Sequence, residues 1–161
     1  MTTYIDCLVH GRLRPVTGSR CVGLIDPATE LPSSFVRLCS SADVDAALKS
    51  SHRLASDWAV SSVADRQQVL RRIRAALDVR QEGFVQAMAA DIGCPVWLSR
   101  NLHVPMALKD LDIAAVALTE VRWTEVIGNA VVERVPHGVV AAITPWNAPL
   151  HQMVAKVAAA I

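Results

Sequence analysis

The residue best placed to do chemistry in this sequence is Asn147, which lies in a short turn between Pro145 and Pro149. The turn follows residues 139–143, an uninterrupted apolar run typical of a strand buried on both faces of a parallel sheet. Open α/β sheets bind ligands at the carboxyl ends of their strands. A buried amide there can donate a hydrogen bond to an oxyanion that develops during a reaction. The alternative is that Asn147 only fixes the turn through local hydrogen bonds.

Polar side chains also occur on the helix that the apolar spacing predicts after this turn. Lys156 follows Gln152 by one helical turn, so both side chains lie on one face. Lys156 either serves the site or only adds a solubilising charge to an alanine-rich helix. His151 begins the helix, and a structural role with a satisfied hydrogen bond explains it better than a role as general base.

Cys94 is the cysteine nearest to a catalytic context, in a predicted loop after a helix. No histidine stands at a spacing typical of a nucleophile and its base, so we exclude Cys94 as a nucleophile. The four cysteines form no C-x-x-C pair, and the N-terminus has no signal peptide pattern. We therefore expect free thiols and a cytoplasmic protein. Neither the cysteines nor the five histidines show metal-ligand spacing, so no metal site is expected.

The composition indicates a folded chain of about one domain. Of its 161 residues, 52% are hydrophobic and 19% are charged, which excludes a disordered or low-complexity sequence. The net charge of +1 gives no electrostatic reason to expect nucleic acid or a membrane surface as a partner. No apolar run reaches the length of a membrane span.

The elements that would position these residues begin with a small N-terminal β layer. Alternating or apolar runs predict strands at residues 4–9, 21–25 and 35–39. Capping-box patterns starting at Ser40 and Ser62 predict the first two helices.

Apolar spacing then predicts helices along residues 44–58, 69–77, 80–91 and 104–118, the third stopped by Gly93 and Pro95. Four arginines crowd the second helix, and a solvated face explains them better than an anion site. They are Arg66, Arg71, Arg72 and Arg74.

Three elements are expected to close the sequence. Residues 129–136 form an edge strand with Glu133 and Arg134 midway, residues 139–143 form the buried strand, and a helix follows. No later strand is available to pair with residues 139–143, so the chain is expected to be marginally stable or sticky. The apolar stripe of the last helix is expected to lack a partner as well. It consists of Leu150, Met153, Val154, Val157 and Ile161.

The stretch P-x-G-V-V-x-x-I-x-P-W-N-x-P-L, residues 136–150, resembles the motif that opens the cofactor domain of aldehyde dehydrogenases. Further stretches resemble that family's N-terminal landmarks in the same order. They are Y-I-D at 4–6, D-P-A-T at 26–29, A-x-x-S-x-x-D-R at 59–66 and D-I-G-C-P at 91–95. The resemblance covers nearly the whole chain but only about the first third of a family member.

The resemblance implies an α/β fold in two parts. Residues 1–135 would form an N-terminal β-hairpin and helical layer with a short bridging strand. Residues 136–161 would form the first strand-helix unit of a truncated, Rossmann-like cofactor domain. The bridging strand helps family members associate, which implies a homo-oligomer or docking on a full-length relative.

The resemblance also assigns roles to site residues. The Asn147 amide, with the backbone amide of the nucleophilic cysteine, would hold the thiohemiacetal oxyanion. Lys156 would correspond to a lysine near the active site. The positions that border the nicotinamide of NAD or NADP would be Ile143, Thr144, Pro145 and Trp146.

Several departures from the family bear on activity. Ala141 replaces a common glycine and could crowd the site, whereas Ala148 replaces a common aromatic residue and would widen the aldehyde tunnel. The sequence lacks the family's Lys-Pro-Ser motif, glycine-rich cofactor loop, general-base glutamate and nucleophilic cysteine. The resemblance implies NAD(P)-dependent oxidation of an aldehyde to a carboxylate in the parent enzyme. Because these motifs are missing, we expect no activity of this chain alone. Binding of the cofactor by these residues alone stays open.

Two other interpretations stay open. One is a non-catalytic interaction module or a subunit of a split enzyme. The other is a decayed gene product.

Overall fold

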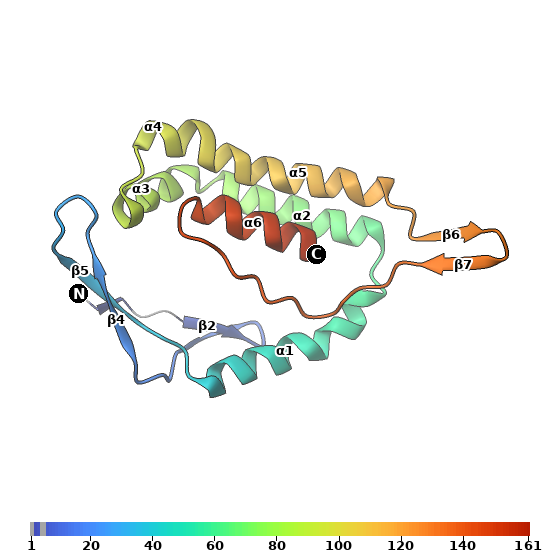
Figure 1. Ribbon diagram of the computed structural model, residues 1–161, viewed down its shortest axis with the longest axis horizontal. Coiled ribbons are helices and arrows are strands. Elements are labelled where there is room, and N and C mark those ends of the chain that lie inside the picture. Colours follow the sequence, from blue (N-terminus) through green and yellow to red (C-terminus); the bar gives the residue numbers. More distant parts are fainter. Residues whose placement is uncertain (1, 4–5) are drawn as a thin grey trace. The chain divides into compact units, whose positions relative to one another are not determined.

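The computed structural model describes residues 2–3 and 6–161 of the chain (Figure 1). The chain divides into two compact units, Met1–Trp58 and Ala59–Ile161. The mixture of helices and strands agrees with the predicted α/β class. Tyr4 and Ile5, which begin the first expected strand, lie outside the described residues.

The N-terminal unit contains two small sheets. Strands β2 (Asp6–Val9) and β3 (Arg12–Pro15) form an antiparallel hairpin. Strand β5 (Pro32–Arg37) pairs antiparallel with β4 (Cys21–Ile25) and parallel with β1 (Thr2–Thr3), giving the order β1-β5-β4. The prediction of β4 is confirmed at both ends, and the described part of the first expected strand is β2.

The turn between β2 and β3 explains why the sequence analysis missed β3. His10 and Gly11 have φ angles of 52° and 70°, as both central positions of a type I′ hairpin turn require.

The third expected strand, residues 35–39, lies earlier than predicted, at Pro32–Arg37. The β4–β5 pairing ends at Cys21 and Arg37, and one further backbone hydrogen bond follows it, from the Leu38 amide to the Arg20 carbonyl at 2.9 Å.

Helix α1 (Ser41–Ala59) begins at a reciprocal cap, which confirms the capping box predicted at Ser40. The Asp43 amide donates to Ser40 Oγ at 3.1 Å, and the Ser40 amide donates to Asp43 Oδ2 at 2.8 Å. Thr17 adds two hydrogen bonds of 2.8 Å to the Asp43 carboxylate, from its backbone amide and its hydroxyl. The cap therefore links residues 15–20 to the start of α1.

The second unit is mainly helical, and α5 packs against both α2 and α6 (Figure 1). All the helices predicted here are present, and the second capping box is confirmed at Ser62. Gly93, with a φ angle of 64°, ends α3 as predicted. The short α4 and a π-helical turn before α5 were not predicted. The bounds are α2 (Val63–Asp78), α3 (Gln81–Ile92), α4 (Val96–Leu98), η1 (Ser99–His103), α5 (Val104–Glu120) and α6 (Pro149–Ala160).

The core of this unit is formed by side chains from α2, α3, α5 and α6. Its most deeply buried large residues, Leu70 and Leu111, come from α2 and α5 and are each 1% exposed. The other core residues are Val85, Met88, Cys94, Val104, Ala107, Leu150, Val154 and Ala158. No helix in the described part of the chain is both long and apolar enough to cross a membrane.

The apolar stripe of α6 is better covered than the sequence analysis expected. Leu150 and Val154 are buried against the core, because α5 supplies the apolar face that the prediction overlooked. Met153 and Val157 remain partly in solvent, at 51% and 36% exposed. The expectation of an unpartnered stripe was therefore wrong for the buried half of the helix.

Strands β6 (Thr124–Ile127) and β7 (Ala130–Glu133) form an antiparallel hairpin after α5. Gly128 occupies the first turn position with a φ angle of 61°, the conformation used there in a type II′ turn. The expected strand at residues 129–136 is thus shorter than predicted. The β6–β7 pairing ends at Thr124 and Glu133, and one further backbone hydrogen bond follows it, from the Arg134 amide to the Trp123 carbonyl at 2.8 Å.

The prediction of a buried strand at residues 139–143 is wrong for this structure. These residues form neither helix nor strand, and Ile143 is 85% exposed. A strand requires a neighbour for its backbone amides and carbonyls. No strand within residues 2–3 and 6–161 pairs with this segment.

Candidate functional site

Five of the six predicted site residues lie in the segment that leads into α6, and the sixth, Lys156, lies on that helix. Ile143 and Trp146 are 85% and 77% exposed, and Asn147 is exposed as well. The turn is continuous with α6, since the Gln152 amide donates to the Ala148 carbonyl at 2.9 Å. The structure thus presents Asn147 on the surface and does not enclose its amide, so its role as an oxyanion donor stays a prediction.

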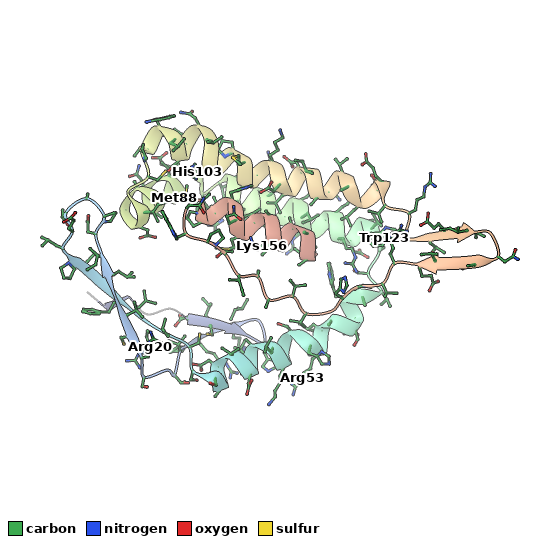
Figure 2. The ribbon with its side chains drawn as sticks, viewed as in Figure 1. Arg20, Arg53, Met88, His103, Trp123 and Lys156 are labelled. Atoms are coloured by element: carbon green, nitrogen blue, oxygen red, sulfur yellow. The ribbon has the colours of Figure 1, made fainter. Side chains whose placement is uncertain are left out.

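Lys156 lies on α6 (Figure 2), and its predicted neighbour Gln152 belongs to the same helix. Lys156 Nζ donates to Gln152 Oε1 at 3.2 Å, which confirms that the two side chains share a helical face. Both residues are half-buried. The contact gives Lys156 a local partner, while its relation to a catalytic centre stays a prediction.

His151 joins α6 to α5. Its Nδ1 lies 2.7 Å from Oδ2 of Asp110, and both side chains are mostly buried, at 22% and 23% exposed. This contact agrees with the structural role expected for His151. The sequence analysis missed Asp110, because a single carboxylate on α5 gives no signal until the packing of α6 is known.

Cys94 lies in the helical core and is 9% exposed. A nucleophile must reach its substrate and a base. The burial of Cys94 therefore agrees with its exclusion as a catalytic residue.

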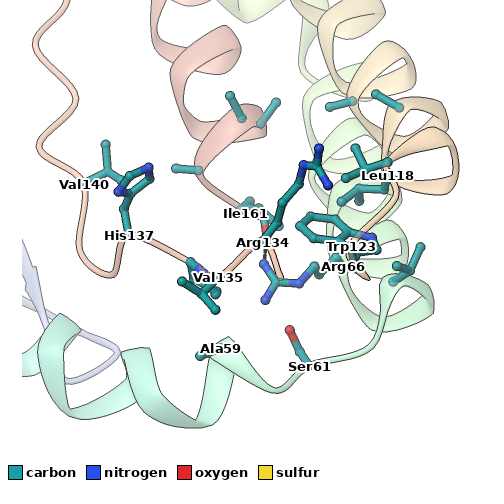
Figure 3. Close-up of a pocket in the computed structure, with 18 of the residues that line it drawn as sticks. Ala59, Ser61, Arg66, Leu118, Trp123, Arg134, Val135, His137, Val140 and Ile161 are labelled. Carbon is teal, nitrogen blue, oxygen red and sulfur yellow. Dashed lines mark hydrogen bonds between the residues drawn. The ribbon is translucent and has the colours of Figure 1, made fainter. Parts of the chain in front are cut away.

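A groove of about 750 Å³ lies within the second unit, between the helix ends and residues 134–140 (Figure 3). Its walls come from the start of α2 and the C-terminal halves of α5 and α6, and most of its residues are apolar. Leu118, Trp123, Val140 and Ile161 are among them. Sequence analysis missed this groove because alanines and valines from distant segments build it.

None of the predicted site residues lines the groove. Asn147, Lys156 and the four positions assigned to the nicotinamide all lie outside it. The groove and the predicted site are therefore separate features of the unit.

The arginines at the groove already have protein partners. Arg134 donates to the Arg122 carbonyl and, at 2.9 Å, to Glu125 Oε1. Arg66 donates to the carbonyl of Ile161. The groove is therefore largely apolar, with a few polar residues among those that line it.

The arginine run on α2 does not form one anion site. Arg74 Nε lies 2.9 Å from Asp112 of α5, and this carboxylate raises the pKa of Arg74. Arg71 and Arg72 are exposed. The structure thus favours the interpretation of a solvated, ion-paired helix face.

The described turn does not by itself fit a dinucleotide. A cofactor needs a concave site that buries most of its surface, whereas Ile143 and Trp146 lie open to solvent. These residues can form at most one wall of a cofactor site.

Comparison with known proteins now identifies the family. Residues 15–161 match the sequence model of the Aldehyde dehydrogenase family, and this chain belongs to that family. The 3-succinoylsemialdehyde-pyridine dehydrogenase of a Pseudomonas species is 32% identical over 162 residues, which is 100% of this chain and 34% of that protein. The chain thus spans about a third of the length of the curated relatives that it matches.

Solved structures agree with this assignment. Aldehyde dehydrogenase C of Pseudomonas syringae, a cysteine-to-alanine mutant in complex with NAD⁺ and octanal, has a TM-score of 0.88 at 32% identity. The match covers 96% of this chain and 33% of that structure. A Mycobacterium tuberculosis aldehyde dehydrogenase in complex with NAD⁺ gives a TM-score of 0.85 at 28% identity, with 96% and 33% coverage.

Proposed function

We propose that this chain supplies the N-terminal third of a cytoplasmic NAD(P)-dependent aldehyde dehydrogenase, which oxidises an aldehyde to a carboxylate. The observation that carries the proposal is the family match over residues 15–161. The similarity to enzymes solved with NAD⁺, one of them also with octanal, supports the cofactor and substrate class.

The role proposed for this chain in the reaction is oxyanion stabilisation by Asn147. When a thiolate attacks the aldehyde carbonyl, the carbonyl oxygen becomes negatively charged. The side-chain amide of Asn147 would donate a hydrogen bond to that oxygen, and one such donor contributes about 10²–10³ in kcat. Ala148, the next residue, would leave room for a bulky aldehyde.

The chain by itself is proposed to be inactive. Covalent aldehyde oxidation needs a nucleophile held beside its base and its oxyanion donors. The cysteine of the helical unit, Cys94, is buried in the core, and the turn that carries Asn147 does not enclose a cofactor. The remaining two thirds of an aldehyde dehydrogenase would complete both the cofactor site and the catalytic centre.

A direct test compares the chain alone with a chimera. In the chimera, these 161 residues replace the matching third of the Pseudomonas syringae enzyme, whose mutated cysteine is restored. We expect NAD⁺-linked oxidation of octanal by the chimera and none by the chain alone. Turnover by the chain alone that is lost in Cys94→Ala would overturn the proposal, as would a folded, NAD⁺-binding chimera with no activity.

A second candidate function is association with another polypeptide, which the β6–β7 hairpin favours. Both of its edges are unpaired within the described residues, and Val126 and Val131 are 74% and 64% exposed. An unpaired apolar edge is a template for strand pairing. The partner would be a second copy or a full-length relative, and light scattering over a range of concentrations would detect it. Dimers that disappear in Val126→Lys would support this function, and a monomer at all concentrations, alone or mixed with the relative, would contradict it.

A further inference from the structure

Two cysteines of the N-terminal unit lie close together, outside the features assigned to catalysis. Cys7 belongs to β2, and Cys39 lies two residues before α1. Their Sγ atoms are 2.9 Å apart. Both are free thiols, Cys39 exposed and Cys7 half-buried.

The spacing brings the two sulfurs near bonding distance. A disulfide has an S–S length of about 2.03–2.05 Å, so the gap must close by less than about 1 Å. Each cysteine lies in or beside a segment that hydrogen bonds fix in place. Cys7 belongs to β2, which pairs with β3, and Cys39 precedes Ser40, which caps α1. A bond could therefore form by a local adjustment of side chains.

The surroundings assign different roles to the two thiols. The hydrogen bond with Cys39 raises the pKa of Cys7 to about 11, with smaller contributions from burial and from the charges of Cys39, Asp43 and Asp6. Cys39 is exposed and Cys7 is half-buried, so Cys39 is the sulfur that solvent and small oxidants can reach. Attack on an oxidant therefore falls to Cys39, and it proceeds through the thiolate, which is the nucleophilic form of a cysteine.

We propose that Cys7 and Cys39 are an oxidation site that forms an intramolecular disulfide in the presence of a hydroperoxide. The Cys39 thiolate attacks one peroxide oxygen, breaks the O–O bond and becomes a sulfenic acid, releasing hydroxide or alkoxide. Cys7 sulfur then attacks Cys39 sulfur. The S–S bond forms, the S–O bond breaks, and the Cys7 proton leaves with the hydroxyl as water. Two thiols lose two electrons in total, and the peroxide gains them.

The bond would connect the β2–β3 hairpin to the start of α1. It would close a loop of chain that contains β3, β4 and β5. Because a crosslink restricts the unfolded chain, oxidation should raise the melting temperature of the protein.

Peptide mapping of the full chain tests the proposal. The protein is treated with hydrogen peroxide, its free thiols are blocked, and the digest is analysed without reduction. We expect a peptide pair that joins Cys7 to Cys39, with a mass lower by two hydrogens, and its loss after dithiothreitol. Cys7→Ser and Cys39→Ser should abolish it, and Cys21→Ser, the matched exposed control, should keep it.

Two further readouts make the test decisive. Dimedone should label Cys39 in the Cys7→Ser variant, since the sulfenic acid then has no thiol to condense with. Absence of that label would overturn the order of steps. Three outcomes would overturn the site itself. Both thiols could remain reduced, Cys21 could replace either partner in the disulfide, or a non-reducing gel could show only intermolecular dimers.

Discussion

Asn147 is exposed in this structure, although an oxyanion donor is most effective where water is excluded. Under the proposed function, other parts of the enzyme would cover the turn and exclude water from this amide. The turn that carries this side chain already continues into the packed helix α6.

The first prediction concerns this amide. In the active chimera, Asn147→Ala should lower kcat for octanal by about 10²–10³, the usual loss for one oxyanion donor. Asn129→Ala, in the exposed hairpin turn, is the matched control and should leave kcat unchanged. An unaltered kcat in Asn147→Ala, with chemistry shown to be rate-limiting, would remove this residue from the oxyanion role.

The second prediction concerns Gly18 in the N-terminal unit. A Cβ atom at this position would lie 2.0 Å from the Leu38 carbonyl oxygen, so Gly18→Ala must displace backbone. We expect a loss of about 1–3 kcal/mol or more in the free energy of unfolding, measured with urea. Gly83→Ala is the control. Its Cβ would meet no atom within 4 Å, and alanine in a helix should gain up to about 1 kcal/mol. Equal stability of the two variants would contradict the close approach at Gly18.

The third prediction concerns pH. Backbone hydrogen bonds, first from Ser40 and then from Thr17, lower the pKa of Asp43 from 3.8 to about 2. Since the folded-state pKa lies below the unfolded value, the stabilisation is present above about pH 4 and is lost as pH falls towards about 2. Urea unfolding at several pH values should show a weaker acid dependence in Asp43→Asn than in the native sequence. If the free energy of unfolding depended on acid pH equally in both proteins, protonation of Asp43 would not be the cause of that dependence.

Among the elements, local signals were sufficient for the long helices and for β4, and insufficient for the short α4, the π-helical turn and the expected strand at residues 139–143. The boxes at Ser40 and Ser62 and the stop at Gly93 depend on neighbouring residues, so the helix predictions hold. Residues 139–143 have the composition of a buried strand, yet a strand also needs a partner that the apolar pattern does not specify. The same limit concealed Asp110 as the partner of His151.

The fourth prediction tests the role of α5 as the centre of the helical unit. Leu111 is 1% exposed and belongs to the core that joins α2, α5 and α6, so Leu111→Ala should cost about 2–5 kcal/mol. Val116→Ala, on the same helix and 58% exposed, should change stability by less than about 0.5 kcal/mol. Similar losses in both, measured by urea unfolding, would show that α5 does not hold this core together.

For the molecule as a whole, family membership was evident from the motif at residues 136–150, whereas the separation of the apolar groove from the predicted site was not. The motif is contiguous in sequence, but the groove is assembled from α2, α5, α6 and residues 134–140. We propose that these residues complete their site only with the rest of an aldehyde dehydrogenase.

Hydrogen exchange at residues 139–143, measured in the chain alone and in the chimera, tests this proposal. In the chain alone, the amides should exchange rapidly, because they have no strand partner within the described residues. In the chimera, the same amides should be strongly protected, as expected for a strand paired inside a sheet. Strong protection in the chain alone, or rapid exchange in an active chimera, would contradict the claim.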